Sequence, residues 1–382
     1  MPDTASEPGT TGYVSAARRS IWLRGLICLG VAAVTLVAPV PLASGSTAIE
    51  PVHIKVVGGL GGVKQYQEIE QPFWSQKIRE LSGGRITASI HSFDRSGLRG
   101  QEMLQLIRLG VVPFGTAILS LVSGDEPELN AVDLPGLNPD VATLRLSVAA
   151  YRPHVEKLMR DRYGIELLGV YTYPAQVLFC AKPFAGLGDL AGRKIRTSSV
   201  GQSEMMAALG AVPVITPFAE MVGAVSKGVV DCAITGTLSG HQIGLSEVTT
   251  HIHTMAIGWG LSLFGANSAA WDNLPAQHRD IIRSGVAELE QKIWEAAEGD
   301  TQAGLACSSG ADTCSATRRG RMTVVAISPQ DEALRRKLLG ETVLPSWIDR
   351  CGEPCVEAWH ETLGPLHAIA ISAPQAADLT DR

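Results

Sequence analysis

The chain has 382 residues, which at about 150 residues per domain predicts two domains. Hydrophobic residues make up 45% of it and charged residues 18%, a globular composition that excludes a disordered or coiled-coil chain. The formal net charge of -6 offers no basic surface, so no nucleic-acid partner is expected.

The N-terminal segment predicts export from the cytoplasm. Arg18, Arg19 and Arg24 precede an apolar run over 26–38, and small residues follow over 43–46. This order is typical of a secretory signal, and the run is shorter than the ~20 apolar residues of a membrane span. We therefore expect residues 1–48 to be a signal peptide and the mature chain to be exported. The alternatives are an uncleaved anchor and, from the arginine pair, twin-arginine export.

The mature segment reads as alternating strands and helices. Strands are expected over 53–57, 85–90, 165–171, 177–180, 194–197, 212–215 and 229–234, and helices over 63–81, 102–109, 203–209 and 219–227. This alternation predicts an α/β fold with largely parallel sheets.

A long helix is expected from Pro275 to about residue 304. Pro275 suits a first turn, and Ile282, Val286 and Leu289 begin one apolar stripe. At about 1.5 Å per residue, a helix of this length spans roughly 40 Å, which is longer than one small domain.

The cysteine count favours disulfides. Seven cysteines become six once Cys28 leaves with the signal, and an even number suits an oxidising compartment. Cys307 and Cys314 flank a polar loop and are predicted to be bridged. Cys351 and Cys355 allow a second short bridge.

Cys180 and Cys232 differ from these pairs because they lie in apolar, strand-like sequence. A buried cysteine behaves as a small hydrophobic residue. We interpret both as free thiols, with a disulfide as the alternative.

The sequence contains no complete catalytic motif. Gly59-Leu60-Gly61 follows a strand, but Lys64 takes the place of the third glycine of a dinucleotide fingerprint, so this is interpreted as a turn. The segment 236–240 has one residue too many for a nucleophile elbow. His241, His251 and His253 have no cysteine or carboxylate pair to complete a metal site. We expect no enzyme, no cofactor and no metal.

A set of short motifs, each unspecific alone, occurs in one order across the mature chain. In chain order they are Ser82-Gly83-Gly84-Arg85, 133–137, Lys182-Pro183, 187–196, 209–213, Glu220, 228–231 and 270–275. Together they resemble the extracytoplasmic solute-binding protein of tripartite ATP-independent periplasmic (TRAP) transporters, the DctP-like family. The resemblance runs from about residue 52 to about 300, and more loosely to Ile369.

The resemblance implies a two-lobed periplasmic binding protein fold, with crossover strands and a long helix spanning both lobes. It implies a first lobe over 49–173, completed by a segment near 259–274, and a second lobe over 174–258. The spanning helix takes 275–304, and 305–382 form a C-terminal helical and loop segment. A cleft between lobes is where a small ligand is expected.

Arg196 is the central site residue that the resemblance implies, since the family's arginine at this place pairs with a ligand carboxylate. A guanidinium offers a planar fork that matches both carboxylate oxygens. Without the resemblance, a salt bridge between Arg196 and a nearby acidic residue is an equally good interpretation. Arg95 or Arg99 is a candidate for a second positive charge from the first lobe.

The other implied site residues match the family less closely. Phe218 stands where an aromatic side chain packs on the ligand, with ordinary core packing as the alternative. Thr235 replaces an asparagine, and Gln176 replaces a second arginine. Trp259 either walls the cleft or packs between the lobes, and Tyr66 is a further candidate from the first lobe.

The expected function is that of a periplasmic solute receptor, a monomer that delivers a small organic acid to the membrane subunits of a TRAP transporter. Arg196 is the one clear cation expected in the cleft, and Phe218 and Trp259 add apolar surface. These features favour a monocarboxylate over a small dicarboxylate, for example a 2-oxo or 2-hydroxy acid with an apolar or aromatic tail. The alternatives are a secreted enzyme acting on a small carboxylic acid and a ligand-sensing module for a signalling partner.

The signal-peptide interpretation predicts where the exported protein begins. Its first residue should lie between about Gly45 and Pro51, after the small residues that signal peptidases prefer. N-terminal sequencing of periplasmic material measures this position. A sequence beginning at Met1 would contradict the prediction.

Overall fold

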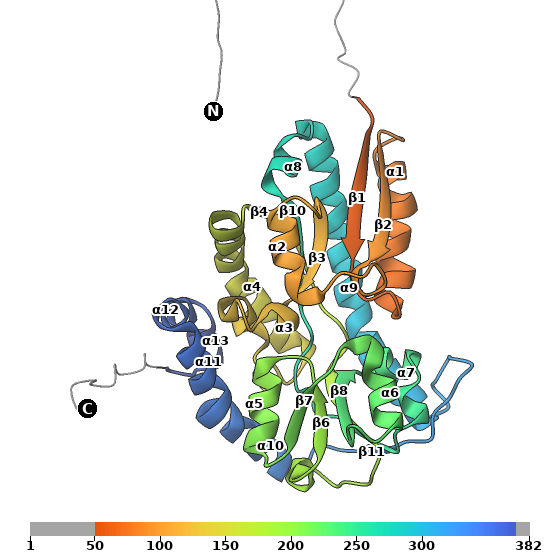
Figure 1. The fold of residues 1–382 in the computed structure, drawn as a ribbon, viewed down its shortest axis with the longest axis vertical. Helices are drawn as coiled ribbons and strands as arrows, with labels where there is room; N and C mark the ends of the chain where they lie inside the picture. The colour runs from red at the N-terminus through yellow and green to blue at the C-terminus, as the bar shows by residue number, and fades with distance from the viewer. Residues whose placement is uncertain (1–49, 372–382) are drawn as a thin grey trace, which may run out of the picture. The chain divides into compact units, whose positions relative to one another are not determined.

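The structure is a computed structural model that describes residues 50–371. The expected signal peptide, with its cleavage site, lies outside the described residues. Within them the chain forms two sheets with helices packed on both, so the two-lobed α/β fold is confirmed (Figure 1). None of the helices between residues 50 and 371 is long and apolar enough to cross a membrane.

The sheet of the first lobe has five strands in the order β2-β1-β3-β10-β4. They are β1 (Val52–Gly58), β2 (Ile86–Ser92), β3 (Phe114–Ile118), β4 (Ile165–Tyr171) and β10 (Ser262–Asn267). The helices around them are η1 (Gln65–Glu70), η2 (Phe73–Lys77), α1 (Ile78–Leu81), η3 (Phe93–Arg95), η4 (Gly100–Glu102), α2 (Met103–Arg108), α3 (Leu119–Val122), η5 (Pro127–Asp133), α4 (Val141–Leu158), η6 (Met159–Tyr163) and α8 (Ser268–Asp272).

The sheet of the second lobe has six strands in the order β11-β9-β5-β8-β6-β7. They are β5 (Gln176–Cys180), β6 (Lys194–Thr197), β7 (Val212–Ile215), β8 (Cys232–Gly236), β9 (His251–His253) and β11 (Thr323–Val325). Its helices are η7 (Leu187–Leu190), α5 (Val200–Ala208), η8 (Phe218–Glu220), α6 (Met221–Ser226), α7 (Thr237–Gln242) and η9 (Leu245–Glu247).

The expectation of largely parallel sheets is confirmed, with one exception in each sheet. β10 runs antiparallel to both β3 and β4, and β5 runs antiparallel to β8 and β9. The physical reason lies in the connections, because β5 follows a passage out of the first lobe and β10 follows the passage back. Each enters its sheet from the side facing the other lobe and therefore runs against its neighbours. The lobe boundaries given above stay a prediction.

Two element boundaries also differ from expectation. The strand expected from Val229 begins at Cys232, because Gly228 takes a left-handed conformation and the N–H groups of Val229 and Val230 turn back to Ala224 O. The helix expected over 63–81 is a succession of wide turns and one regular turn, with Pro72 between η1 and η2.

The long helix α9 spans Ala276–Ser309 and passes both sheets (Figure 1). It packs on β4 and α1 of the first lobe and on α7 of the second. The stripe from Ile282 to Ile293 is buried in the first lobe, as its spacing predicts. Gly304 lies so close to the backbone of Thr237 and Leu238 that a Cβ there would overlap it.

After α9 and β11 the chain forms α10 (Pro329–Leu338), η10 (Leu339–Val343), α11 (Leu344–Cys351), α12 (Glu353–Glu361) and α13 (Leu363–His367). This segment contacts both lobes. Asp331 of α10 accepts a hydrogen bond from Leu187 N in the second lobe, and Trp347 of α11 donates one to Pro127 O in the first. It thus adds a connection beside the crossover strands.

Three disulfides link the cysteines of the described segment. The predicted Cys307–Cys314 bridge is confirmed, and Cys351 is bridged to Cys355. The interpretation of Cys180 and Cys232 as free thiols is wrong. They face each other on the antiparallel pair β5 and β8 with Cα atoms 4.1 Å apart, which joins them across the sheet. Strand register decides this pairing, and sequence spacing does not show it.

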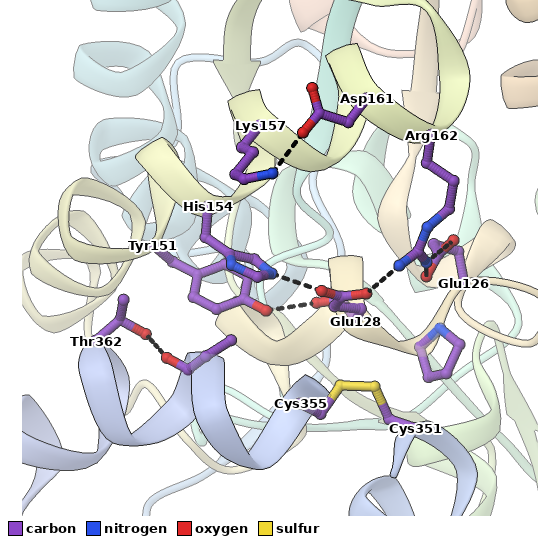
Figure 2. Close-up of polar contacts among 12 residues, drawn as sticks. Glu126, Glu128, Tyr151, His154, Lys157, Asp161, Arg162, Cys351, Cys355 and Thr362 are labelled. Atoms are coloured by element: carbon purple, nitrogen blue, oxygen red, sulfur yellow. Dashed lines mark hydrogen bonds and ion pairs between the residues drawn. A yellow bond between two sulfur atoms is a disulfide. The ribbon is translucent and has the colours of Figure 1, made fainter. Parts of the chain in front are cut away.

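An ionic cluster with buried carboxylates anchors the segment before the first crossover (Figure 2). The carboxylate of Glu128 lies between His154 Nε2, at 2.7 Å, and Arg162 Nη2, at 2.9 Å. Arg162 also contacts Glu126, whose Oε2 accepts a hydrogen bond from Tyr163 OH. The bond from His154 and the charge of Arg162 lower the pKa of Glu128 in spite of its burial. The cluster holds the start of η5 against α4 and η6.

At the other end of η5, Asp133 binds the crossover backbone. Its carboxylate accepts hydrogen bonds from the N–H groups of Trp259 at 2.9 Å, Gly260 at 2.7 Å and Leu261 at 3.3 Å. Burial raises the pKa of Asp133 to about 6 despite these three donors. One side chain therefore satisfies three successive donors at the point where the chain returns to the first lobe.

Asp133→Ala should destabilise the fold by at least about 3 kcal/mol, because each buried N–H left without an acceptor costs about 1–3 kcal/mol. Urea denaturation measures the change. The matched control is Asp140→Ala, which removes the exposed cap of α4 and should cost about 1 kcal/mol. Equal shifts of the two denaturation midpoints would contradict the role of Asp133.

Candidate functional site

A cavity of about 330 Å³ lies between the two sheets. From the first lobe it is lined by Leu60, Phe93, Asp94, Leu98, Arg99, Gly100, Gln101, Ile118, Ser120, Leu121 and Tyr173. From the second lobe it is lined by Gln176, Arg196, Ser198, Pro217, Phe218, Ala219, Glu220, Thr235, Gly236 and Ser239.

The carboxyl ends of parallel strands supply most of this lining. β1, β2 and β3 end next to the lining residues of the first lobe, and β6, β7 and β8 end next to those of the second. Ligands of α/β proteins bind outside the carboxyl ends of their strands, because loops and unpaired backbone groups gather there. The two lobes present these ends to each other, which makes the cavity a cleft with two such walls.

Arg196 is held at the wall of the second lobe by backbone carbonyls. It lies on β6 between β7 and β8, and its side chain donates from Nε to Thr216 O at 2.9 Å and from Nη1 to Ile234 O at 2.7 Å. A guanidinium has five N–H donors. Among the described residues, Nη2 has no hydrogen-bond partner, so this edge of the fork is free for a ligand, and Arg196 lines the cavity.

The charge of Arg196 is buried without a counter-charge. Its residue is 3% exposed, and no carboxylate between residues 50 and 371 lies within ion-pair distance of it. Burial lowers the pKa of Arg196 to about 10, which leaves it protonated at neutral pH. An uncompensated buried charge is costly, so the site favours an anion. The salt bridge considered as an alternative does not form.

The wall of the first lobe contains a glycine-rich loop held by side chains. The successive N–H groups of residues 59–61 donate to Glu70 Oε2 at 2.9 Å, Tyr173 OH at 3.4 Å and Asp94 Oδ1 at 2.9 Å. A Cβ at Gly59 would overlap the Tyr173 hydroxyl, which explains that glycine. Burial raises the pKa of both Glu70 and Tyr173. The three N–H groups of this loop therefore already have protein acceptors and are not free to hold a phosphate.

The structure brings four of the six expected site residues together. Gln176, Arg196, Phe218 and Thr235 line the cavity, from four separate segments of the second lobe. Thr235 is buried at the end of β8, and Gln176 begins β5. Phe218 is only partly buried, so it is free to contact a ligand.

Tyr66 and Trp259 do not line the cavity. Tyr66 is 7% exposed and packs in the core of the first lobe behind Gly58. Trp259 is 3% exposed and donates from Nε1 to Asn138 O, which corresponds to the packing alternative. Proximity in sequence to the glycine loop and to the crossover suggested both, but Tyr66 lies on η1 and packs into the core, and Asp133 holds the backbone of Trp259.

The structure separates the two arginine candidates of the first lobe. Arg99 lies at the rim of the cavity, with a side chain 79% exposed and 3.5 Å from Glu102. Arg95 lies in a separate surface hollow with Tyr66 and His91. A buried second cation is therefore absent from the described cavity lining, and the only reachable one is the exposed Arg99.

Sequence reasoning missed most of the first-lobe wall. Asp94 and Tyr173 follow strand ends, which was the one available signal for them. The apolar residues Leu98, Ile118 and Leu121 could not be identified from the sequence, because an apolar residue that lines a cavity looks the same there as one that packs in the core.

Comparison with known proteins identifies the family. The family model "Bacterial extracellular solute-binding protein, family 7" (DctP) matches residues 62–331. A curated solute-binding protein of Albidiferax ferrireducens is 26% identical over 277 residues, covering 71% of this chain and 80% of that protein. The C4-dicarboxylate-binding periplasmic protein DctP of Rhodobacter capsulatus is 23% identical over 266 residues, covering 68% of this chain and 77% of that protein.

Solved structures share the fold. DctP7, a Bordetella pertussis extracytoplasmic solute receptor binding pyroglutamic acid, has a TM-score of 0.73 and 22% identity, covering 81% of this chain and 99% of that one. A TRAP solute-binding protein of Desulfovibrio salexigens with orotic acid has a TM-score of 0.73 and 18% identity, covering 83% and 98%. A TRAP solute-binding protein of Rhodoferax ferrireducens with malonate has a TM-score of 0.70 and 21% identity, covering 82% of this chain and 99% of that one.

The matched region spans well over half of the chain and contains both walls of the cleft apart from Leu60. The solved structures share the two-lobed fold. This chain therefore belongs to the family 7 bacterial extracellular solute-binding proteins, the DctP-like solute receptors of TRAP transporters, and it is not an enzyme.

Proposed function

We propose that this protein binds a small organic monocarboxylate in the cleft between its lobes and delivers it to the membrane subunits of a TRAP transporter. The observation that carries the proposal is the buried, positively charged Arg196, which has no carboxylate partner among the described residues and lines the cavity. A solute carboxylate on the free edge of the guanidinium supplies the missing charge.

The ligands of similar proteins agree with this chemistry. Pyroglutamic acid, orotic acid and malonate, the solutes named for three structural neighbours, are all carboxylic acids, and the first two carry a single carboxylate. The family role also accounts for a periplasmic location, reached through the proposed signal peptide at 1–48.

The remaining lining indicates what the rest of the solute is like. Leu60, Phe93, Leu98 and Leu121 of the first lobe and Phe218 of the second give a largely apolar chamber. Gln176, Thr235 and Ser239 add neutral hydrogen-bonding groups near Arg196. A solute with one carboxylate, a neighbouring oxo or hydroxy group and an apolar tail places each part against a matching surface. Tyr66 and Trp259 have no place in the proposed site.

Arg196→Ala should weaken solute binding by more than about tenfold. A hydrogen bond to a charged group contributes about 1.5–3 kcal/mol, and about 1.4 kcal/mol is tenfold in affinity. Arg196→Lys should also bind poorly, since an ammonium cannot reproduce the fork. Calorimetric titration of the folded variants measures the affinities. The matched control is Arg95→Ala, which removes an arginine outside the cavity. An Arg196→Ala variant that binds as tightly as the wild type would refute the anchor.

The cleft should prefer monocarboxylates with an apolar or aromatic tail over small dicarboxylates, because Arg196 is its one buried cation within the described residues. A thermal-shift panel containing phenylpyruvate, 4-methyl-2-oxopentanoate, succinate and malate measures this preference. Arg99→Ala, at the exposed rim, should leave monocarboxylate binding nearly unchanged. Stabilisation by succinate or malate alone, and its loss in Arg99→Ala, would show instead that the rim arginine makes this a dicarboxylate receptor.

A further inference from the structure

The loop that follows α9 makes a reciprocal contact with α7, the helix that carries Ser239 at the cavity wall (Figure 1). Arg318 Nη2 donates to the carbonyl oxygens of His241 at 3.2 Å and Gln242 at 2.6 Å, the last two residues of α7. In return the buried ring of His241 contacts Arg318 O through Nε2 at 3.0 Å. A cation at the C-terminal end of a helix satisfies free carbonyls and interacts favourably with the helix dipole.

The loop is itself held in place around Arg318. The Cys307–Cys314 disulfide closes it onto the end of α9, and Gly320 N donates to Cys307 O at 2.7 Å. Arg318 Nη1 makes an ion pair of 2.7 Å with Glu247 of η9, which follows the C-terminal end of α7. The guanidinium is therefore fixed at this end of α7 by two carbonyls and one carboxylate.

The far side of α7 joins the first lobe. Gln242 Oε1 accepts a hydrogen bond from the N–H of Lys64 at 3.0 Å, directly after the glycine-rich loop. Lys64 Nζ in turn contacts Asp300 of α9 at 2.5 Å. The residue that Arg318 caps is thus also the residue that connects α7 to the opposite wall of the cleft.

We propose that Arg318, anchored by the Cys307–Cys314 disulfide, is a positioning residue for the solute cleft, acting through α7 on Ser239 and on the Gln242–Lys64 link between the lobes. α7 has only six residues and is pressed against α9 at Gly304, and Arg318 is the charged side chain that binds the carbonyls of its last two residues. Arg318 itself does not line the cavity. The proposal rests on the proposed function for its effect on solute binding, but its effect on α7 is independent of it.

Hydrogen exchange of the mature protein, followed by mass spectrometry, tests the proposal without any solute. In Arg318→Ala the amides of Ile243, Gly244 and Lys64 should exchange at least about tenfold faster, because two bonds to a charged donor are lost. The matched control is Arg319→Ala. Arg319 is 45% exposed against 47% for Arg318, but its guanidinium contacts Cys314 O and Asp312 within the loop. Exchange at α7 should not change in this variant.

A pair of disulfide variants tests the anchor. Cys307→Ser with Cys314→Ser should reproduce the faster exchange at α7, and Cys351→Ser with Cys355→Ser should not. Unchanged exchange in Arg318→Ala, or equal acceleration in Arg319→Ala, would overturn the positioning role. Unchanged exchange in the Cys307 and Cys314 variant would overturn the role of the disulfide.

Calorimetric titration with phenylpyruvate tests the consequence for the cleft. Arg318→Ala should weaken its binding about three- to tenfold, and Arg319→Ala should not. Equal affinity in Arg318→Ala and the wild type would overturn the link to the cleft. If the wild type binds neither phenylpyruvate nor 4-methyl-2-oxopentanoate, the proposed solute class fails, and the exchange measurements alone still decide whether Arg318 positions α7.

Discussion

A single buried guanidinium sets the requirements for the rest of the cleft. Arg196 stands on a central strand, so its Nε and Nη1 reach carbonyl oxygens beside both neighbouring strands, at Thr216 and Ile234. These two contacts fix its orientation but do not neutralise it, and burial still lowers its pKa. The second lobe therefore holds a cation whose remaining donors point where no protein acceptor lies. Such an arrangement is stable in water and becomes favourable in a closed site only with an anion present.

The walls around this cation depend on charged residues that never reach the solute. Asp133 holds the returning crossover through three N–H groups, and Glu70 holds the glycine-rich loop at Gly59. Arg318 caps α7 from a disulfide-closed loop. Each binds main-chain groups, although Arg318 also pairs with Glu247 and Glu70 also accepts from Gln65. This makes the geometry of the cleft a property of buried polar contacts to main-chain groups, which are directional and costly to leave unmade.

Sequence reasoning succeeded where the information is local and failed where strand pairing decides. The apolar stripe of α9 and the strand containing Arg196 follow from spacing of neighbouring residues, and the ordered motifs led to the family. The Cys180–Cys232 disulfide depends on the register of β5 against β8, which neither segment encodes alone. Trp259 packs inward because Asp133, far away in sequence, binds its backbone. The role of Asp94 depends likewise on a contact with Gly61 that sequence separation conceals.

The division of chemistry between the lobes has a consequence for selectivity. The anchoring charge belongs to the second lobe, and most of the apolar surface belongs to the first. A charge attracts a carboxylate over several ångströms, but apolar surfaces gain free energy only on contact, when water has left. On the proposed function, a solute first binds Arg196 in the open cleft, and only a solute with a matching tail stabilises the first lobe against it. Closure then lowers the local dielectric and strengthens the ion pair already formed. A short acid without a tail engages the same arginine but gives little differential affinity for the closed state, so it shifts the lobes less. Discrimination between acids thus arises at closure, and the apolar residues that sequence reasoning could not identify carry it.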